Sequence, residues 1–215
     1  MVRCTKIRLP EATAANYRSR LTGSELPPIQ VDLDHPLPRK VAVFGAGGKS
    51  SLARAISQKM NLEFIELDWI NHMPGWQIRP PGDANRIVRE RIESSPDGWI
   101  VDHHTAYIRQ LIYQNVESVI VLKLPFRTIF WRRLTRSLKR AWTHEIVCGG
   151  NTETFWQHFF TRESAILEVI QKRWRYATVL DRTIGEAPAG INFYRIRSAN
   201  ELDEFYRLHV LVRDT

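Results

Sequence analysis

The stretch Val41–Ser51, VAVFGAGGKSS, places an apolar run before a glycine cluster and a Lys-Ser-Ser triplet. The run Val41–Phe44 is typical of a central parallel strand that is buried on both faces. The segment Lys49–Met60 repeats apolar residues at helical spacing, so the order is strand, glycine loop, helix. Glycines let backbone N–H groups approach an anion closely, and a helix N-terminus carries partial positive charge. The stretch therefore predicts a phosphate-binding loop over Gly45–Ser51.

We expect every residue of this loop to bind nucleotide: Gly45, Ala46, Gly47, Gly48, Lys49, Ser50 and Ser51. Lys49 would bridge the outer phosphates, and the Ser50 hydroxyl would ligate Mg²⁺. The loop reads G-x-x-G-K-S, two residues shorter than G-x-x-x-x-G-K-[ST], because position 43 is Val43. Such a loop either wraps fewer phosphate oxygens or keeps the fold without tight nucleotide binding. A glycine-rich turn in a sheet that binds nothing is a further alternative.

Length and composition are those of a single globular domain. The chain has 215 residues, of which 43% are hydrophobic and 25% charged. The proline-containing residues 1–38 are expected to form an N-terminal extension and linker, and residues 39–215 the domain. Neither a span of bilayer length nor the apolar core of a signal peptide is evident, and Cys4 and Cys148 lie in no C-x-x-C motif. We expect a cytoplasmic protein without membrane partners.

Acidic residues follow two further predicted strands. Asp68 comes directly after the strand Glu63–Leu67, and Asp102 follows Gly98–Val101. Ligands of open α/β sheets bind beyond the carboxyl ends of the strands, so both carboxylates should lie on the rim of the phosphate loop. Asp68 could hold Mg²⁺ through water or accept a proton from an acceptor hydroxyl, and Asp102 is placed to serve the Mg²⁺. The alternative is that Asp68 merely caps a helix, with Trp69 and Trp76 as core residues.

A basic helix is predicted after the fourth strand, Val119–Leu124. No acidic residue occurs between Leu124 and His144, whereas the segment contains Arg127, Arg132, Arg133, Arg136, Lys139 and Arg140. Guanidinium groups above a phosphate loop can neutralise a transferring phosphoryl group, so we expect a lid at about residues 126–150, with Arg132 and Arg136 acting in catalysis. The net charge of +8 and the nearby Trp131 and Trp142 also fit a nucleic-acid patch.

The last predicted elements are a helix, a strand and a closing helix. The segment from Glu153 to Trp174 is expected to be a long helix with Thr152 as its N-cap. Ile191–Ile196 is the predicted fifth strand, and Ser198 with Glu201 forms a capping box at the start of the closing helix. The expected fold class is α/β, a three-layer P-loop NTPase fold with a five-stranded parallel sheet, helices on both faces and a helical basic lid.

Several motifs in order resemble the adenylate-kinase-related proteins known as DNA topology modulation proteins, over about residues 39–209. The motifs are Leu67-Asp68 followed by Pro74-Gly75-Trp76, Trp99-Ile100-Val101-Asp102, Leu124-Pro125 with its arginine-rich helix, Gly150-Asn151-x-Glu153 and Arg195-Ile196-Arg197-Ser198. The resemblance implies Mg²⁺- and ATP-dependent phosphoryl transfer to a nucleotide-like or other small-molecule acceptor. It implies that Asp68, Trp69 and Trp76 line the acceptor side, that Ser50 and Asp102 serve the metal, and that Arg197 lies beside the adenine.

The chain departs from that family after the third strand. Its Gly-Asn-Tyr is replaced by His103-His104-Thr105, which puts a bulky side chain, His103, where the chain approaches the acceptor. The substrate then differs from the family's, or catalysis is lost. Two hypotheses follow: a P-loop small-molecule or nucleotide kinase, and a non-catalytic or nucleic-acid-binding descendant of the fold that uses the basic helix 127–140.

Overall fold

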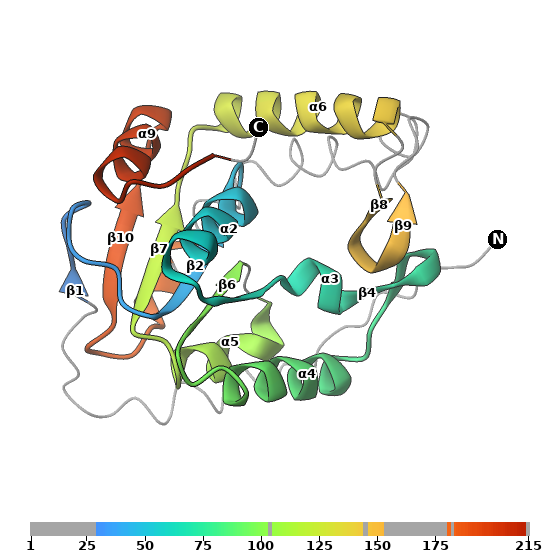
Figure 1. The fold of residues 1–215 in the computed structure, drawn as a ribbon, viewed down its shortest axis with the longest axis horizontal. Coiled ribbons are helices and arrows are strands. Elements are labelled where there is room, and N and C mark those ends of the chain that lie inside the picture. Colours follow the sequence, from blue (N-terminus) through green and yellow to red (C-terminus); the bar gives the residue numbers. More distant parts are fainter. Residues whose placement is uncertain (1–28, 103–104, 144–145, 153–179, 182, 214–215) are drawn as a thin grey trace.

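A computed structural model describes residues 29–102, 105–143, 146–152, 180–181 and 183–213 of the chain. Its centre is a six-stranded sheet in which every pairing is parallel, in the order β1-β10-β7-β2-β6-β3 (Figure 1). The strands are β1 (Ile29–Gln30), β2 (Lys40–Gly45), β3 (Glu63–Ile65), β6 (Trp99–Asp102), β7 (Ser118–Leu122) and β10 (Asn192–Ile196). The predicted α/β class with a parallel sheet is confirmed.

The predicted number of five strands is wrong, because the N-terminal segment adds a sixth. Strand β1 pairs with β10, and the Ile29 N–H donates to the Ile191 carbonyl at 3.1 Å. Beyond it, Val31, Leu33 and Leu37 pack against the core. A two-residue strand among prolines has no measurable hydrophobic period, so sequence patterning could not find it.

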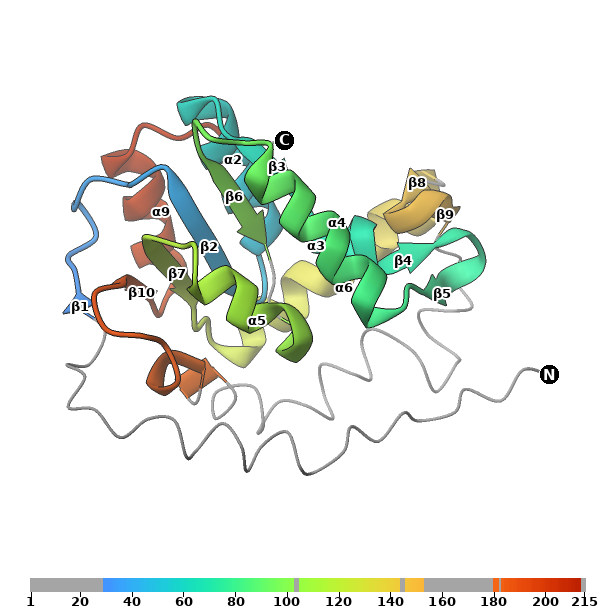
Figure 2. The ribbon, with the colours of Figure 1, turned by 90° about the horizontal axis from the view of Figure 1, so that it is seen from below.

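Two layers of helices cover the sheet, as Figure 2 shows from below. The helices α2 (Lys49–Met60) and α9 (Ala199–Leu208) pack on one face, and α4 (Pro81–Glu93) and α5 (Ala106–Tyr113) on the other. Alternate strand residues feed the two cores: Val41 and Val43 point to the first, and Ala42 and Phe44 to the second. Strand β2 is therefore buried on both faces, as its continuous apolar run predicts.

The segment after β3 differs from the prediction. Leu67, assigned to the strand, begins the short helix α3 (Leu67–Asn71). A small hairpin follows, made of β4 (His72–Met73), the 3-10 turn η1 (Pro74–Trp76) and β5 (Gln77–Ile78). Helix α4 then begins at Pro81, since proline is well suited to the first turn of a helix.

The basic helix after β7 is present as α6 (Phe126–Thr143). A second small hairpin follows, made of β8 (Ile146–Val147), the 3-10 turn η2 (Cys148–Gly150) and β9 (Asn151–Thr152). Thr152 belongs to β9 in this structure, and the predicted helix from Glu153 to Trp174 lies outside the described residues. None of the described helices combines the length and apolar character that a membrane crossing requires.

The closing helix begins as predicted at Ser198. The Ser198 Oγ accepts from the Glu201 N–H at 3.1 Å, and the Glu201 carboxylate accepts from the Arg197 N–H at 2.7 Å. In a standard capping box the carboxylate would accept from the N-cap residue itself. The reciprocal pair is thus shifted by one residue, and it fixes Arg197 at the end of β10.

Candidate phosphate-binding site

The glycine loop joins β2 to α2 at the carboxyl edge of the sheet. Gly45, Gly47 and Gly48 have φ angles of 117°, 78° and 140°, a region that side-chain-bearing residues rarely adopt. A Cβ on Gly45 would lie 2.2 Å from the Leu122 carbonyl oxygen of the neighbouring strand β7. The loop is therefore built against β7 with no room for a side chain at its first position.

The N-terminus of α2 is open to an anion. Gly48 is the N-cap residue, no side chain caps the helix, and the first turn contains no acidic residue. The first N–H groups of a helix have no partner within the helix and carry partial positive charge. The loop and this helix end together present backbone donors at the position where the sequence predicts phosphate binding.

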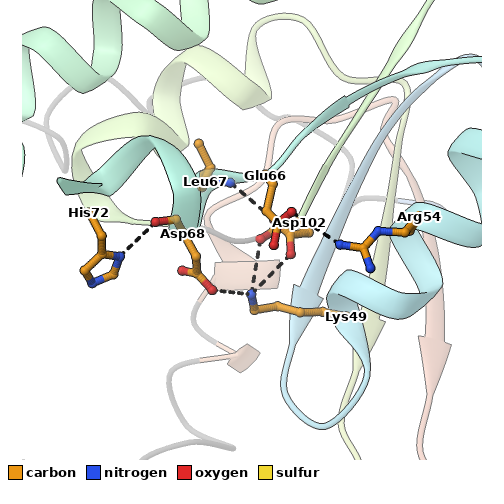
Figure 3. Close-up of polar contacts among 7 residues, drawn as sticks. All are labelled: Lys49, Arg54, Glu66, Leu67, Asp68, His72 and Asp102. Atoms are coloured by element: carbon orange, nitrogen blue, oxygen red, sulfur yellow. Dashed lines mark hydrogen bonds and ion pairs between the residues drawn. The ribbon is translucent and has the colours of Figure 1, made fainter. Parts of the chain in front are cut away.

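Lys49 connects the loop to two other strand ends (Figure 3). Its Nζ lies 3.4 Å from the Asp68 carboxylate and 3.5 Å from the Asp102 carboxylate, and it donates to the Asp102 carbonyl oxygen at 3.3 Å. Strands β2, β6 and β3 are adjacent, so their carboxyl ends bring together residues 19 to 53 positions apart. The predicted convergence of Lys49, Asp68 and Asp102 is what the structure shows.

Asp102 is fully buried, with 0% of its surface exposed. Its Oδ1 accepts from the Leu67 N–H at 3.3 Å, whereas its Oδ2 has no hydrogen-bond partner among the described residues. Burial raises the pKa of this carboxyl above its ordinary value of 3.8; Lys49 and a hydrogen bond from Ser50 oppose that rise, and Asp68 adds to it. Buried carboxylate oxygens usually bind a donor or a metal ion. The Oδ2 atom lies 3.5 Å from the Lys49 Nζ, so the ion pair with Lys49 compensates the buried negative charge in this structure.

Glu66 is a further acidic member of the site that the sequence reasoning missed. Burial first, and the nearby Asp102 second, raise the pKa of its carboxyl above 4.5, while Arg54, 3.4 Å away, lowers it. A charged residue between Ile65 and Leu67 at the end of a buried strand was the signal that could have found it. Glu66 and Arg54 thus form a second ion pair beside the one that Lys49 makes with Asp68 and Asp102.

The acceptor-side residues lie on α3 and the hairpin after it. Asp68 does not cap α3, because Glu66 is the N-cap residue and no side chain provides a cap hydrogen bond. Trp69 and Trp76 are 45% and 38% exposed, so they are not core residues. The alternative of a helix cap with two core aromatics is wrong. The His72 Nδ1 lies 2.8 Å from the Asp68 carbonyl oxygen, and its ring meets that of Trp76 edge to face at 5.8 Å.

The Asn151 side chain connects this hairpin by hydrogen bonds to the hairpin that follows α6. Its Oδ1 accepts from the Trp76 N–H at 3.0 Å, and its Nδ2 donates to the carbonyl oxygens of Met73 at 3.0 Å and Cys148 at 2.6 Å. The side chain is buried, and Trp76 holds a positive φ of 58° at this contact. Nothing in the local sequence pattern indicates such a role, because it depends on two hairpins meeting in space.

The lid arginines are placed unequally. The Arg132 Nη1 donates to the Gly47 carbonyl oxygen at 2.6 Å, so α6 lies directly against the loop, with Ile129 also close to Gly47. Arg136 and Arg197 are exposed. His103 lies outside the described residues. The structure therefore brings one predicted lid residue, Arg132, to the loop.

A metal site made of protein ligands alone is not present in the part of the chain that the structure describes: no three carboxylate, imidazole or thiol groups converge there. Mg²⁺ commonly uses one or two protein ligands together with water and substrate phosphates. The Ser50 hydroxyl and the Asp102 carboxylate fit that requirement. A separate open hollow of about 440 Å³, lined by residues 203–213, shares no residue with this site.

Comparison with known proteins identifies no family. No family model matches the chain, and no curated protein matches it. Among solved structures the chain is similar to an unliganded sugar kinase from Janibacter sp. HTCC2649, with 16% identity over 81% of this chain and 91% of that chain, and a TM-score of 0.42. A similarity at this level carries no information about the reaction.

Proposed function

We propose that the protein is a P-loop phosphotransferase that uses ATP and Mg²⁺ to phosphorylate a nucleotide-like or other small-molecule acceptor. The observation that carries the proposal is the meeting of Lys49, at the uncapped start of α2, with Asp68 and Asp102 from two other strand ends. Each feature alone is common. Their combination places an anion-binding helix end, the Lys49 amino group and two carboxylates at one edge of the sheet.

The charges of Lys49, Asp68 and Asp102 fit a phosphate ligand that binds together with Mg²⁺, rather than a neutral ligand. In the free protein Lys49 is paired with two carboxylates, and one of them, that of Asp102, is fully buried. A triphosphate bound to the loop would compete for the Lys49 amino group, and a Mg²⁺ ion held by Ser50 and Asp102 would offset the negative charge that Lys49 leaves behind. The cation would also screen the phosphate oxygens from an incoming nucleophile.

The chain's own residues then have separate roles. Gly45–Ser51 bind the donor phosphates through backbone N–H groups, and Lys49 stabilises charge on the outer phosphates. Asp68, 37% exposed at its side chain, is accessible to an acceptor and accepts the proton of its hydroxyl. The acceptor oxygen attacks the γ-phosphorus, the bond to the β-phosphate oxygen breaks, and ADP leaves. Arg132 holds the loop through the Gly47 carbonyl oxygen.

The exposed rings of Trp69 and Trp76 support an acceptor that has a flat or apolar face. Both follow Asp68 in sequence, Trp69 directly and Trp76 eight positions on, and Asn151 binds the backbone N–H of the second. Aromatic rings that remain exposed beside a charged site provide stacking surface for a ligand. This arrangement fits a nucleoside-like acceptor and does not define which one.

The test is transfer of label from γ-labelled ATP to a panel of nucleosides, nucleoside monophosphates and small polyols, followed by chromatography. We expect Mg²⁺-dependent transfer to at least one acceptor class, reduced at least about a hundredfold in Asp68→Asn. Arg86→Ala is the matched control, since Arg86 is exposed and its ion pair within the described part of the chain is with Glu90 on the same helix, α4. Transfer that persists unchanged in both Lys49→Met and Asp68→Asn would contradict the proposal.

A further inference from the structure

Helix α6 has two faces with different surroundings. The inward face carries Ile129, which is buried, and Arg132, which donates to the glycine loop. The opposite face is exposed to solvent along the length of the helix. We call this the outer face of α6, and define it by six exposed residues: Arg127, Trp131, Thr135, Leu138, Lys139 and Trp142. The role proposed above for α6 uses only the inward face.

Two tryptophans on the outer face are unusually exposed. Trp131 is 61% exposed and Trp142 is 87% exposed, whereas the core tryptophan Trp99 is fully buried. The two exposed tryptophans are eleven positions apart, which is about three helical turns. Their side chains therefore leave the helix on the same side, about 16 Å apart along its axis. Trp131 also contacts the Phe130 ring edge to face at 5.8 Å, which limits its motion. Neither ring belongs to the two core clusters formed by the described residues.

The charge of the helix restricts the choice of partner. α6 contains six basic residues and no acidic one in 18 positions. Two of them, Arg127 and Lys139, lie on the outer face, and against a second copy of the same face these charges would repel. A polyanion would release counterions on binding and so gain affinity.

The mixture of groups on the face distinguishes a nucleic acid from a membrane. A helix that lies in a bilayer surface separates a continuous apolar face from a charged one. Here Thr135, Leu138 and Lys139 lie between the tryptophans, so polar and charged side chains interrupt the apolar ones along one stripe. Single-stranded nucleic acid offers the matching alternation of bases, which stack on aromatic rings, and phosphates, which pair with cations. Duplex bases are already stacked on one another and would not use the rings.

We propose that the outer face of α6 binds single-stranded nucleic acid, with Trp131 and Trp142 stacking on bases and Arg127 and Lys139 contacting phosphates. Binding of this kind tolerates any base sequence and weakens steeply with salt. It does not depend on the proposed phosphotransferase activity, because no residue of the outer face belongs to the phosphate-binding site.

The test is fluorescence anisotropy of labelled twelve-nucleotide oligo(dT) and oligo(rU) at several salt concentrations. Trp131→Ala and Trp142→Ala should each weaken binding about tenfold, and the double variant more, because each removes one stacking surface. Val212→Ala and Arg86→Ala are controls, since they remove an exposed apolar and an exposed basic side chain elsewhere. Lys49→Met should leave oligonucleotide binding unchanged, which separates this result from the test of the phosphotransferase.

Four outcomes would overturn the inference. The first is no binding by the wild-type protein at low salt, and the second is binding that both tryptophan variants retain. The third is displacement of the oligonucleotide by ATP, which would place it in the phosphate site. The fourth is binding of the outer face to another partner instead: vesicles of phosphatidylserine and phosphatidylcholine, or a second copy in sedimentation equilibrium. Apart from Lys49, all the substituted side chains are exposed, so thermal unfolding should show these variants to be folded.

Discussion

Asn151 is the residue on which the arrangement of the acceptor side depends most. Its buried amide satisfies three backbone groups in two hairpins, and it does so 75 residues from Trp76 in sequence. Asn151→Ala leaves those groups without partners, so we expect a loss of about 1–3 kcal/mol in the free energy of unfolding. The Trp76 amide should also exchange its hydrogen faster. Hydrogen exchange followed by mass spectrometry measures both changes in one experiment.

Asn115→Ala provides the control, because Asn115 also donates a side-chain hydrogen bond but only to Leu111, within its own helix end. Exchange at residues 72–78 should be unchanged in that variant. Equal protection of the hairpin in Asn151→Ala and in the wild type would show that the amide does not hold it.

Among single residues, the sequence could predict Lys49, Asp68 and Asp102 as members of the site. Each lies close to the end of an apolar strand, and parallel strands end at one edge of the sheet. It could not indicate Asn151 or the burial of Glu66. Those depend on contacts between segments far apart in the chain, which no local period records. Their placement became visible only with the two hairpins and β6 in position.

The glycine loop is the element whose geometry is most exacting. Gly45 combines a φ of 117° with a position where a Cβ would meet the Leu122 carbonyl oxygen at 2.2 Å. Gly45→Ala must shift β7 or the loop, and we expect it to lower stability by about 3 kcal/mol or more. Gly82→Ala is the matched control, since nothing lies within 4 Å of that position and it stands in the first turn of α4. Urea unfolding of both variants measures the difference.

A stability of Gly45→Ala equal to that of Gly82→Ala would mean that the loop adopts another conformation.

The longer elements were predictable because their apolar residues recur at a clear period: α2 spans Lys49–Met60 in the structure, as its spacing indicates. Elements of two or three residues were not. Strand β1 and the two hairpins form because neighbouring backbone offers hydrogen-bond partners, a property of the assembled sheet rather than of their own residues.

Over the whole molecule, Tyr194 links the N-terminal segment to the sheet. Its hydroxyl donates to the carbonyl oxygens of His35 at 3.1 Å and Pro36 at 2.9 Å. Burial raises the pKa of this phenol from 10.0 to about 12. The folded state therefore favours the neutral form: the stability this group contributes is fully present below pH 10.0 and is lost as the pH rises through about 12.

Tyr194→Phe cannot ionise and should lack this loss. Urea unfolding between neutral pH and pH 12 should show the wild type declining more steeply than the variant, although the variant is less stable by about 1 kcal/mol at neutral pH because its hydrogen bonds are missing. Parallel decline of the two proteins would show that Tyr194 titrates at its ordinary pKa.

The central claim is that the short glycine loop binds a nucleoside triphosphate through Lys49, and calorimetric titration of ATP with Mg²⁺ tests it most directly. We predict saturable binding by the wild type and by Arg86→Ala, and loss of binding in Lys49→Met. Asp102→Asn, which keeps Lys49 and can keep the hydrogen bond from the Leu67 N–H, should weaken binding only when Mg²⁺ is present. Absence of binding in the wild-type protein, or equal affinity in wild type and Lys49→Met, would contradict the account.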